Sequence, residues 1–131
     1  MITHHPVTLS PSSAADGLSN LLSVLDEYSK YQLIISYPNA DTQNRELIDI
    51  LSEYCLKDKT RTFLCRSLGQ RNYLSCVKHC KMVIGNSSSG LIEVPTFGIP
   101  TVNIGDRQKG RLTGDTVISC NDSKKSIRKS I

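Results

Sequence analysis

The chain has 131 residues, of which 38% are hydrophobic and 21% are charged, and its formal net charge is +4. This length suits one domain with a single buried core. Because the charge is mild and the Lys and Arg residues are scattered, the composition argues against a nucleic-acid partner, and the basic tail 124–129 is typical of a solvated helix face.

Membrane insertion, secretion and disulfides are not expected either. No apolar run approaches the roughly 20 residues that a membrane helix needs. Residues 1–6 lack the basic-then-apolar layout of a signal peptide. The cysteines number five and form no C-x-x-C pair. Free thiols in a reducing cytoplasm are the simplest interpretation.

Short apolar segments alternate with amphipathic segments along the chain. The apolar segments predict strands at 2–3, 31–36, 61–65, 81–84, 101–104 and 116–119. Helical spacing of apolar residues predicts helices at 13–29, around 47–54, at 70–80, at 89–97 and from about 122. This alternation implies right-handed crossovers and a parallel sheet covered on both faces. The sequence therefore predicts one three-layer α/β domain spanning residues 1–131.

Polar and glycine-rich residues gather in the loops that follow the predicted strands. Ligands of open parallel sheets bind outside the carboxyl ends of the strands. The loops at those ends are 5–6, 38–39, 66–69, 85–90 and 105–111. We therefore expect these loops to form one binding site together.

The loop 85–90 (GNSSSG) lies between an apolar strand and a helix. Three hydroxyls and the N–H groups of a helix start suit an anion, and glycine lets the backbone approach it closely. The alternative is a plain helix cap formed by Ser88 or Ser89, without a ligand. The loop is not a Walker A motif, because Leu91 and Ile92 follow its second glycine.

Two charged features follow the serine loop. Glu93 lies near the start of the same helix, where the dipole alone favours a carboxylate, but a carboxylate there also suits ribose hydroxyls. The loop 105–111 contains three cations and two glycines. Its guanidinium groups pair well with phosphate oxygens, although such runs are usually exposed basic loops.

Three further candidates are ambiguous from the residues alone. His5 is able to carry a proton or contact phosphate near neutral pH, although a lone histidine is more often structural. Asn39 suits a ligand contact or its own turn. Cys76, His79 and Cys80 invite a metal site, but no second cluster supplies the remaining ligands, and core thiols are the better interpretation.

Residues 83–111 read VIGNSSSGLIEVPTFGIPTVNIGDRQKGR. This long segment closely resembles the UDP-N-acetylglucosamine 2-epimerase family, above all its hydrolysing branch of the sialic-acid pathway. Segments 5–8, 37–41 and 67–71 also resemble family segments in the same order, so the resemblance covers essentially the whole chain. It implies a GT-B fold, in which two Rossmann-like domains face each other across a cleft, and this chain resembles the C-terminal half.

The resemblance implies roles for residues in binding UDP. Ser87 and Ser88 would hold the diphosphate, Glu93 would grip the ribose hydroxyls, and Arg107 would lie close to the phosphates. Leu68 would lie near the uracil.

The resemblance also implies that His5 and Asn39 reach the ligand from neighbouring strand ends, and His5 is the candidate catalytic residue. Hydrolysing members convert UDP-N-acetylglucosamine into UDP and N-acetylmannosamine. The implied path removes the C2 proton, expels UDP to give a glycal, and adds water with inversion at C2. The scheme requires no metal and no cofactor, and this domain would stabilise the departing diphosphate.

The chain is much shorter than the members of that family. The domain that would carry most of the proton-transferring carboxylates is absent, so we expect an N-terminal partner domain, in cis or as a separate chain. Alone, the chain is expected to bind UDP weakly and to turn over no substrate. The sequence also leaves open the formation of a homodimer. The alternatives are a non-catalytic nucleotide-sugar-binding module and a GT-B glycosyltransferase domain. The stretch 106–111 favours the epimerase over the transferase.

Overall fold

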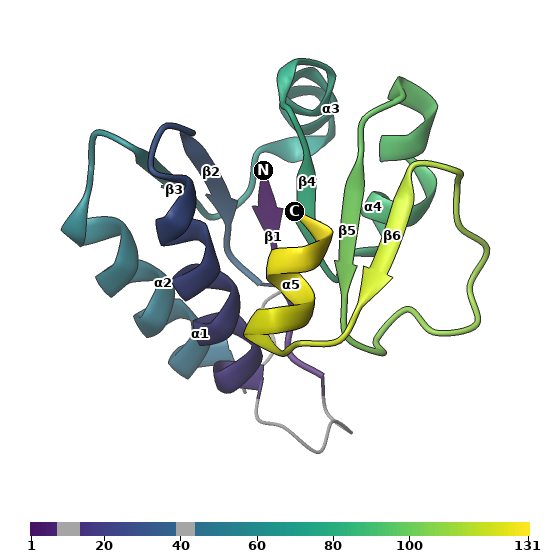
Figure 1. Cartoon of the computed structure of the whole chain (residues 1–131). Coiled ribbons are helices and arrows are strands. Elements are labelled where there is room, and N and C mark those ends of the chain that lie inside the picture. Colours follow the sequence, from purple (N-terminus) through teal and green to yellow (C-terminus); the bar gives the residue numbers. More distant parts are fainter. Residues whose placement is uncertain (8–13, 39–43) are drawn as a thin grey trace.

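The computed structural model describes residues 1–7, 14–38 and 44–131. Within these residues, six strands form one sheet in which every neighbouring pair is parallel, in the order β3-β2-β1-β4-β5-β6 (Figure 1). The strands are β1 (Ile2–Thr3), β2 (Leu33–Ser36), β3 (Thr62–Cys65), β4 (Val83–Gly85), β5 (Thr101–Ile104) and β6 (Val117–Cys120). The expected Rossmann-like parallel sheet is confirmed.

Helices cover both faces of this sheet. The helices of one face are α1 (Ala14–Leu25), α2 (Arg45–Lys57) and α5 (Lys124–Ser130), and those of the other face are α3 (Gly69–His79) and α4 (Ser88–Ile92) (Figure 1). Short 3-10 turns, η1 (Asp26–Tyr28) and η3 (Val94–Phe97), extend α1 and α4. None of the helices in the described residues is long and apolar enough to cross a membrane.

Each face of the sheet has its own hydrophobic core. The larger core packs α1, α2 and α5 on the strands; Leu18 and Leu21 of α1 and Ile35 of β2 are fully buried in it. The smaller core lies under α3, where Val77 packs with Val83 and Val94. The strands β1, β4 and β5 are buried along their whole length, which explains why they read as continuous apolar runs in the sequence.

The direction of the strand order reverses between β1 and β4. From β1 the chain builds outward to β2 and β3, and it then returns to place β4, β5 and β6 on the other side. In open α/β sheets the ligand crevice lies at this switch point, outside the carboxyl ends of the strands. Here those ends are Thr3 and Gly85, which are paired in register. A Cβ on Gly85 would lie 1.9 Å from the Thr3 carbonyl oxygen, so only glycine lets these strand ends approach so closely.

The helix predicted at 89–97 is interrupted in the structure. It divides into α4 and η3, and Pro95 lies at the start of the second piece. Proline has no N–H to donate to the carbonyl four residues earlier. That carbonyl, on Leu91, instead accepts a hydrogen bond from the Gly114 N–H at 3.1 Å. The predicted end at residue 97 is confirmed, because η3 ends at Phe97 and Gly98 closes it in the left-handed conformation with φ 67.

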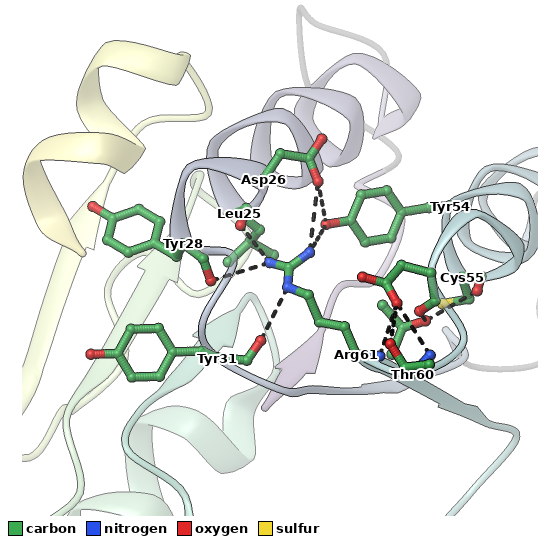
Figure 2. Close-up of polar contacts among 10 residues, drawn as sticks. Leu25, Asp26, Tyr28, Tyr31, Tyr54, Cys55, Thr60 and Arg61 are labelled. Atoms are coloured by element: carbon green, nitrogen blue, oxygen red, sulfur yellow. Dashed lines mark hydrogen bonds and ion pairs between the residues drawn. The ribbon is translucent and has the colours of Figure 1, made fainter.

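Arg61 ties the amino ends of β2 and β3 to the helices (Figure 2). Its guanidinium donates to the carbonyl oxygens of Leu25 at 2.6 Å and Tyr31 at 3.1 Å, and to the Tyr54 hydroxyl at 3.1 Å. Its side chain is only 10% exposed. A cation at the C-terminal carbonyls of a helix is stabilising. Arg61 therefore has a structural role at the edge of the sheet opposite the switch point.

Candidate functional site

A cavity of about 830 Å³ opens at the carboxyl edge of the sheet. The loops after β1, β2, β3 and β4 all contribute to its lining, as the sequence predicts for four of the five loops. Four of the predicted residues line it, namely His5, Leu68, Ser87 and Glu93. Ser88 and Arg107 lie in the described part of the chain but are not among the lining residues. Asn39 lies outside the described residues.

Asn86 fixes the position of His5 at the switch point. The His5 backbone N–H donates to Asn86 Oδ1 at 2.7 Å, and Asn86 Nδ2 donates to the His5 carbonyl oxygen at 2.8 Å. Both residues are buried, with 7% and 1% of their surface exposed. Because buried hydrogen bonds are costly to break, this pair locks the loop after β1 to the loop after β4.

The backbone of Asn86 also joins the serine loop to the basic loop. Its carbonyl oxygen accepts hydrogen bonds from Arg107 Nη1 at 3.0 Å and from Gln108 Nε2 at 2.8 Å. Gln108 is buried, whereas Arg107 is exposed. The fifth predicted loop therefore lies against the serine loop without lining the cavity, and it holds a guanidinium beside it.

The start of α4 differs from the helix cap that the sequence suggests. The N-cap residue of α4 is Ser87, not Ser88 or Ser89, and within the described residues its side chain makes no capping hydrogen bond. The cap expected at Ser88 or Ser89 is therefore wrong, because both residues already belong to the helix. Ser87 instead lines the cavity, where its hydroxyl and the N–H groups of the first turn suit an anion.

Glu93 belongs to a chain of hydrogen bonds at the cavity wall. Ser89 Oγ donates to Glu93 Oε2, and the same hydroxyl lies 2.7 Å from the Tyr73 hydroxyl. Burial raises the pKa of Tyr73, so the phenol keeps its proton at neutral pH. Ser89, Tyr73 and Glu93 all line the cavity.

Leu68 lies at the turn from β3 into α3. The Ser67 hydroxyl accepts a hydrogen bond from the Gly69 N–H at 3.1 Å, and Gly69 has a positive φ of 66. Leu68 packs against the smaller core while it lines the cavity. The turn thus presents an apolar side chain beside backbone polar groups, an arrangement that suits a flat heterocycle.

His4 is buried in the protein and, unlike His5, is not among the residues that line the cavity. Its side chain is 5% exposed, and among the described residues its Nδ1 has no hydrogen-bond partner. Burial, reinforced by the nearby His5, lowers the pKa of His4 from 6.5 to about 4. His4 is therefore neutral at pH 7, and the cavity wall carries His5 instead.

A second hollow of about 590 Å³ lies at the opposite edge of the sheet. Its wall includes Met1, Leu33 and Met82 at the amino ends of three strands, and Cys76 and Cys80 near the end of α3. A helix C-terminus disfavours anions, so this hollow does not suit a phosphate. The cysteines of the chain are free thiols, and no group of three potential metal ligands occurs among the described residues.

Asn86, Gln108 and Tyr73 were not singled out from the sequence. Asn86 stands in the serine loop, but its partner His5 is 81 residues away in the chain. Gln108 lies between two cations in the sequence, and their charge made the loop look like a basic loop rather than a buried contact. Tyr73 reads as one more apolar position of α3, so no local signal separates it from core residues.

Comparisons with known proteins agree with this architecture. The family model described as "UDP-N-acetylglucosamine 2-epimerase" matches residues 1–131. A Campylobacter jejuni protein named GDP/UDP-N,N'-diacetylbacillosamine 2-epimerase (hydrolyzing) is 42% identical over 90% of this chain and 31% of its own length. The Escherichia coli polysialic acid biosynthesis protein P7 is 38% identical over 100% of this chain and 33% of its own length. The chain thus spans about a third of these relatives.

A solved structure shares the fold. The crystal structure of Methanocaldococcus jannaschii UDP-GlcNAc 2-epimerase, in complex with UDP-GlcNAc and UDP, superposes with a TM-score of 0.70. The match covers 98% of this chain and 36% of that one, at 16% sequence identity. At this identity the likeness concerns the fold.

Proposed function

Because the chain belongs to the UDP-N-acetylglucosamine 2-epimerase family, we propose that it is the UDP-binding, C-terminal part of a hydrolysing 2-epimerase. The whole protein would convert UDP-N-acetylglucosamine into UDP and N-acetylmannosamine in the cytoplasm. The rest of that protein, in cis or as a second chain, would supply the carboxylates that move protons. The chain alone would bind UDP without turnover.

One observation carries this proposal: the cavity lies at the topological switch point, where His5, Ser87 and Asn86 converge from two neighbouring strands. The diphosphate would lie against Ser87 and Ser88, and Arg107 would contact it from the adjacent loop. The contact of Arg107 with the Asn86 carbonyl keeps this cation beside the serine loop before a ligand arrives. A cation held in place in this way loses little entropy on binding.

The uridine would extend from the phosphates along the cavity wall. Glu93 would accept hydrogen bonds from the ribose hydroxyls, and Leu68 with its loop would contact the uracil. Asn39, which follows β2, would reach the ligand from the neighbouring strand end. Bound in this way, the nucleotide would lie over the four loops that line the cavity.

The chain would contribute to the reaction by stabilising the leaving group. When the glycosidic C–O bond breaks, negative charge develops on the β-phosphate of UDP. Arg107, the Ser87 hydroxyl and the N–H groups of the first turn of α4 interact more strongly with that charge than with the substrate, which lowers the barrier. His5, whose backbone is bonded to the same loop and which lines the cavity, would contact the phosphate or pass a proton to it.

UDP-N,N'-diacetylbacillosamine is a second candidate substrate for the whole protein. The relative that is 42% identical is named for that sugar. Both candidate substrates carry the nucleotide portion that we assign to this cavity, so the roles of His5, Ser87 and Arg107 are the same for either. The sugar itself would be selected across the cleft by the remainder of the protein.

A chimeric protein tests the function. The chain is joined to the part of the Campylobacter jejuni relative that it does not match, and UDP release is measured with each of the two sugar nucleotides. The chain alone and that part alone serve as controls. UDP and a free 2-epimerised sugar formed only by the chimera support the epimerase. A chimera that binds UDP and releases none would instead favour a non-catalytic binding module, and transfer of the sugar to an acceptor would favour a glycosyltransferase.

A further inference from the structure

The hydrogen-bond chain from Tyr73 through Ser89 to Glu93 has a defined direction. A serine hydroxyl carries one proton, and an ionised carboxylate only accepts. Because Ser89 Oγ donates to Glu93 Oε2, its proton is committed to the carboxylate. The Tyr73 hydroxyl, 2.7 Å from Ser89 Oγ, is therefore the donor in the second bond. Burial raises the pKa of Tyr73 and so preserves this donor.

These two hydrogen bonds hold the Glu93 carboxylate in place from two helices. Ser89 lies one turn before Glu93 on α4, and Tyr73 reaches across from α3. A glutamate side chain at the end of a short helix otherwise has several rotamers, and holding one of them before binding reduces the entropy lost with the ligand. The bond to Oε2 also sets the plane in which the carboxylate offers its remaining lone pairs.

We infer that Tyr73 and Ser89 are positioning residues that aim the Glu93 carboxylate at the ribose diol and thereby make the cavity selective for ribonucleotides. This inference rests on the proposed function, since it takes a nucleotide as the ligand. A vicinal diol offers two donors to one carboxylate. A 2′-deoxyribose offers one, so it loses a hydrogen bond to a charged acceptor at the cavity wall.

The test compares UDP with 2′-deoxy-UDP by titration calorimetry of the 131-residue chain. The unaltered chain is expected to prefer UDP by about tenfold, the usual effect of one hydrogen bond to a charged group. Tyr73→Phe and Ser89→Ala are each expected to reduce that preference to about threefold or less, mainly by weakening UDP. A general loss of structure would weaken both ligands alike, so the ratio reports on the aim of the carboxylate.

Tyr54→Phe is the matched control. It removes a hydroxyl that is also hydrogen-bonded, to Asp26 and Arg61, at the far edge of the sheet. Its preference for UDP is expected to stay at the level of the unaltered chain. Tyr73→Phe removes a single oxygen atom, and it decides the case by itself if Ser89→Ala unfolds.

Glu93→Gln separates the positioning role of Tyr73 and Ser89 from the ribose contact of Glu93 itself. If it removes the preference for UDP while Tyr73→Phe and Ser89→Ala retain it in full, the positioning role is refuted and the proposed UDP site stands. If Glu93→Gln keeps the preference, the assignment of Glu93 to the ribose is overturned, and if the unaltered chain binds no UDP, the proposed function itself is overturned. Loss of preference in all three variants supports the inference.

Discussion

Asn86 and His5 exchange two hydrogen bonds, at 2.7 and 2.8 Å, although 81 residues separate them in the chain. The bonds join the loops that leave β1 and β4 at the point where the strand order reverses. The carbonyl oxygen of Asn86 also accepts hydrogen bonds from the side chains of Arg107 and Gln108. One residue therefore brings together the histidine, serine and arginine loops that we assign to the diphosphate.

Asn86→Ala tests this organising role. The change leaves the His5 N–H and carbonyl groups without their partners in a buried place, which is expected to lower the free energy of unfolding by about 3 kcal/mol. UDP binding is expected to weaken as well, because the loop after β1 is released. Urea unfolding and calorimetry measure the two effects. Asn121→Ala, in an exposed turn, is the control. A stability loss at Asn86 no greater than that at Asn121 would contradict the role.

Arg107→Ala and Ser87→Ala test the phosphate contacts. Each is expected to weaken UDP binding by about 1.5–3 kcal/mol, since a hydrogen bond to a charged phosphate is lost. Calorimetric titration with UDP gives the affinities. Arg111→Ala removes an exposed cation from the same loop and is expected to change the affinity by less than about 0.5 kcal/mol. Unchanged affinity in both Arg107→Ala and Ser87→Ala would refute the assigned site.

Gly85→Ala tests the close approach of β1 and β4. Its φ is 143, and the added Cβ would overlap the Thr3 carbonyl oxygen. The loss of stability is expected to exceed about 3 kcal/mol. Gly98 also has a positive φ, of 67, but a Cβ there meets nothing within 4 Å. Gly98→Ala is therefore expected to cost only about 1 kcal/mol of backbone strain. Equal losses of unfolding free energy at the two glycines would show that the overlap is unimportant.

His4 makes stability depend on pH. Its pKa is about 4 in the folded chain and about 6.5 when unfolded, so the unfolded state binds more protons between these values. The contribution of His4 is fully present above pH 6.5 and is lost as the pH falls towards 4. The loss is expected to be on the order of 3 kcal/mol.

Urea unfolding at pH 7 and pH 5 checks this dependence. His4→Gln is expected to reduce the difference in unfolding free energy between the two pH values. The same substitution at His79, which is exposed on α3, is the control. A pH dependence that is identical in His4→Gln and the unaltered chain would rule out His4 as its source.

The sequence predicts the fold closely because local patterns determine it. Apolar runs mark the buried strands, and the strand predicted at 101–104 has the same bounds in the structure. The helix predicted to end at 97 does end there, and Gly98 closes it. The break at Pro95 was not predicted, because it depends on a bond between the Leu91 carbonyl and the distant Gly114.

The site was predicted less completely, and for a physical reason. His5, Leu68, Ser87 and Glu93 stand at strand ends and helix starts, so the rule that ligands bind at the carboxyl edge places them together. Asn86 and Tyr73 gain their importance only from partners in other elements. Arg61 likewise shows its role only in the structure: this cation next to β3 donates hydrogen bonds to the Leu25 carbonyl of α1 and the Tyr54 hydroxyl of α2 (Figure 2).

An amide chemical-shift map of the 131-residue chain titrated with UDP tests most directly whether a nucleotide binds at the carboxyl edge of the sheet. We expect the largest shifts at His5, in the loop 67–70, at 86–90 and at Glu93 and Arg107, with little change at the apolar hollow on the opposite edge. Shifts that cluster instead around Met1, Tyr31, Cys76 and Ile131, which line that hollow, would contradict a nucleotide site at the switch point.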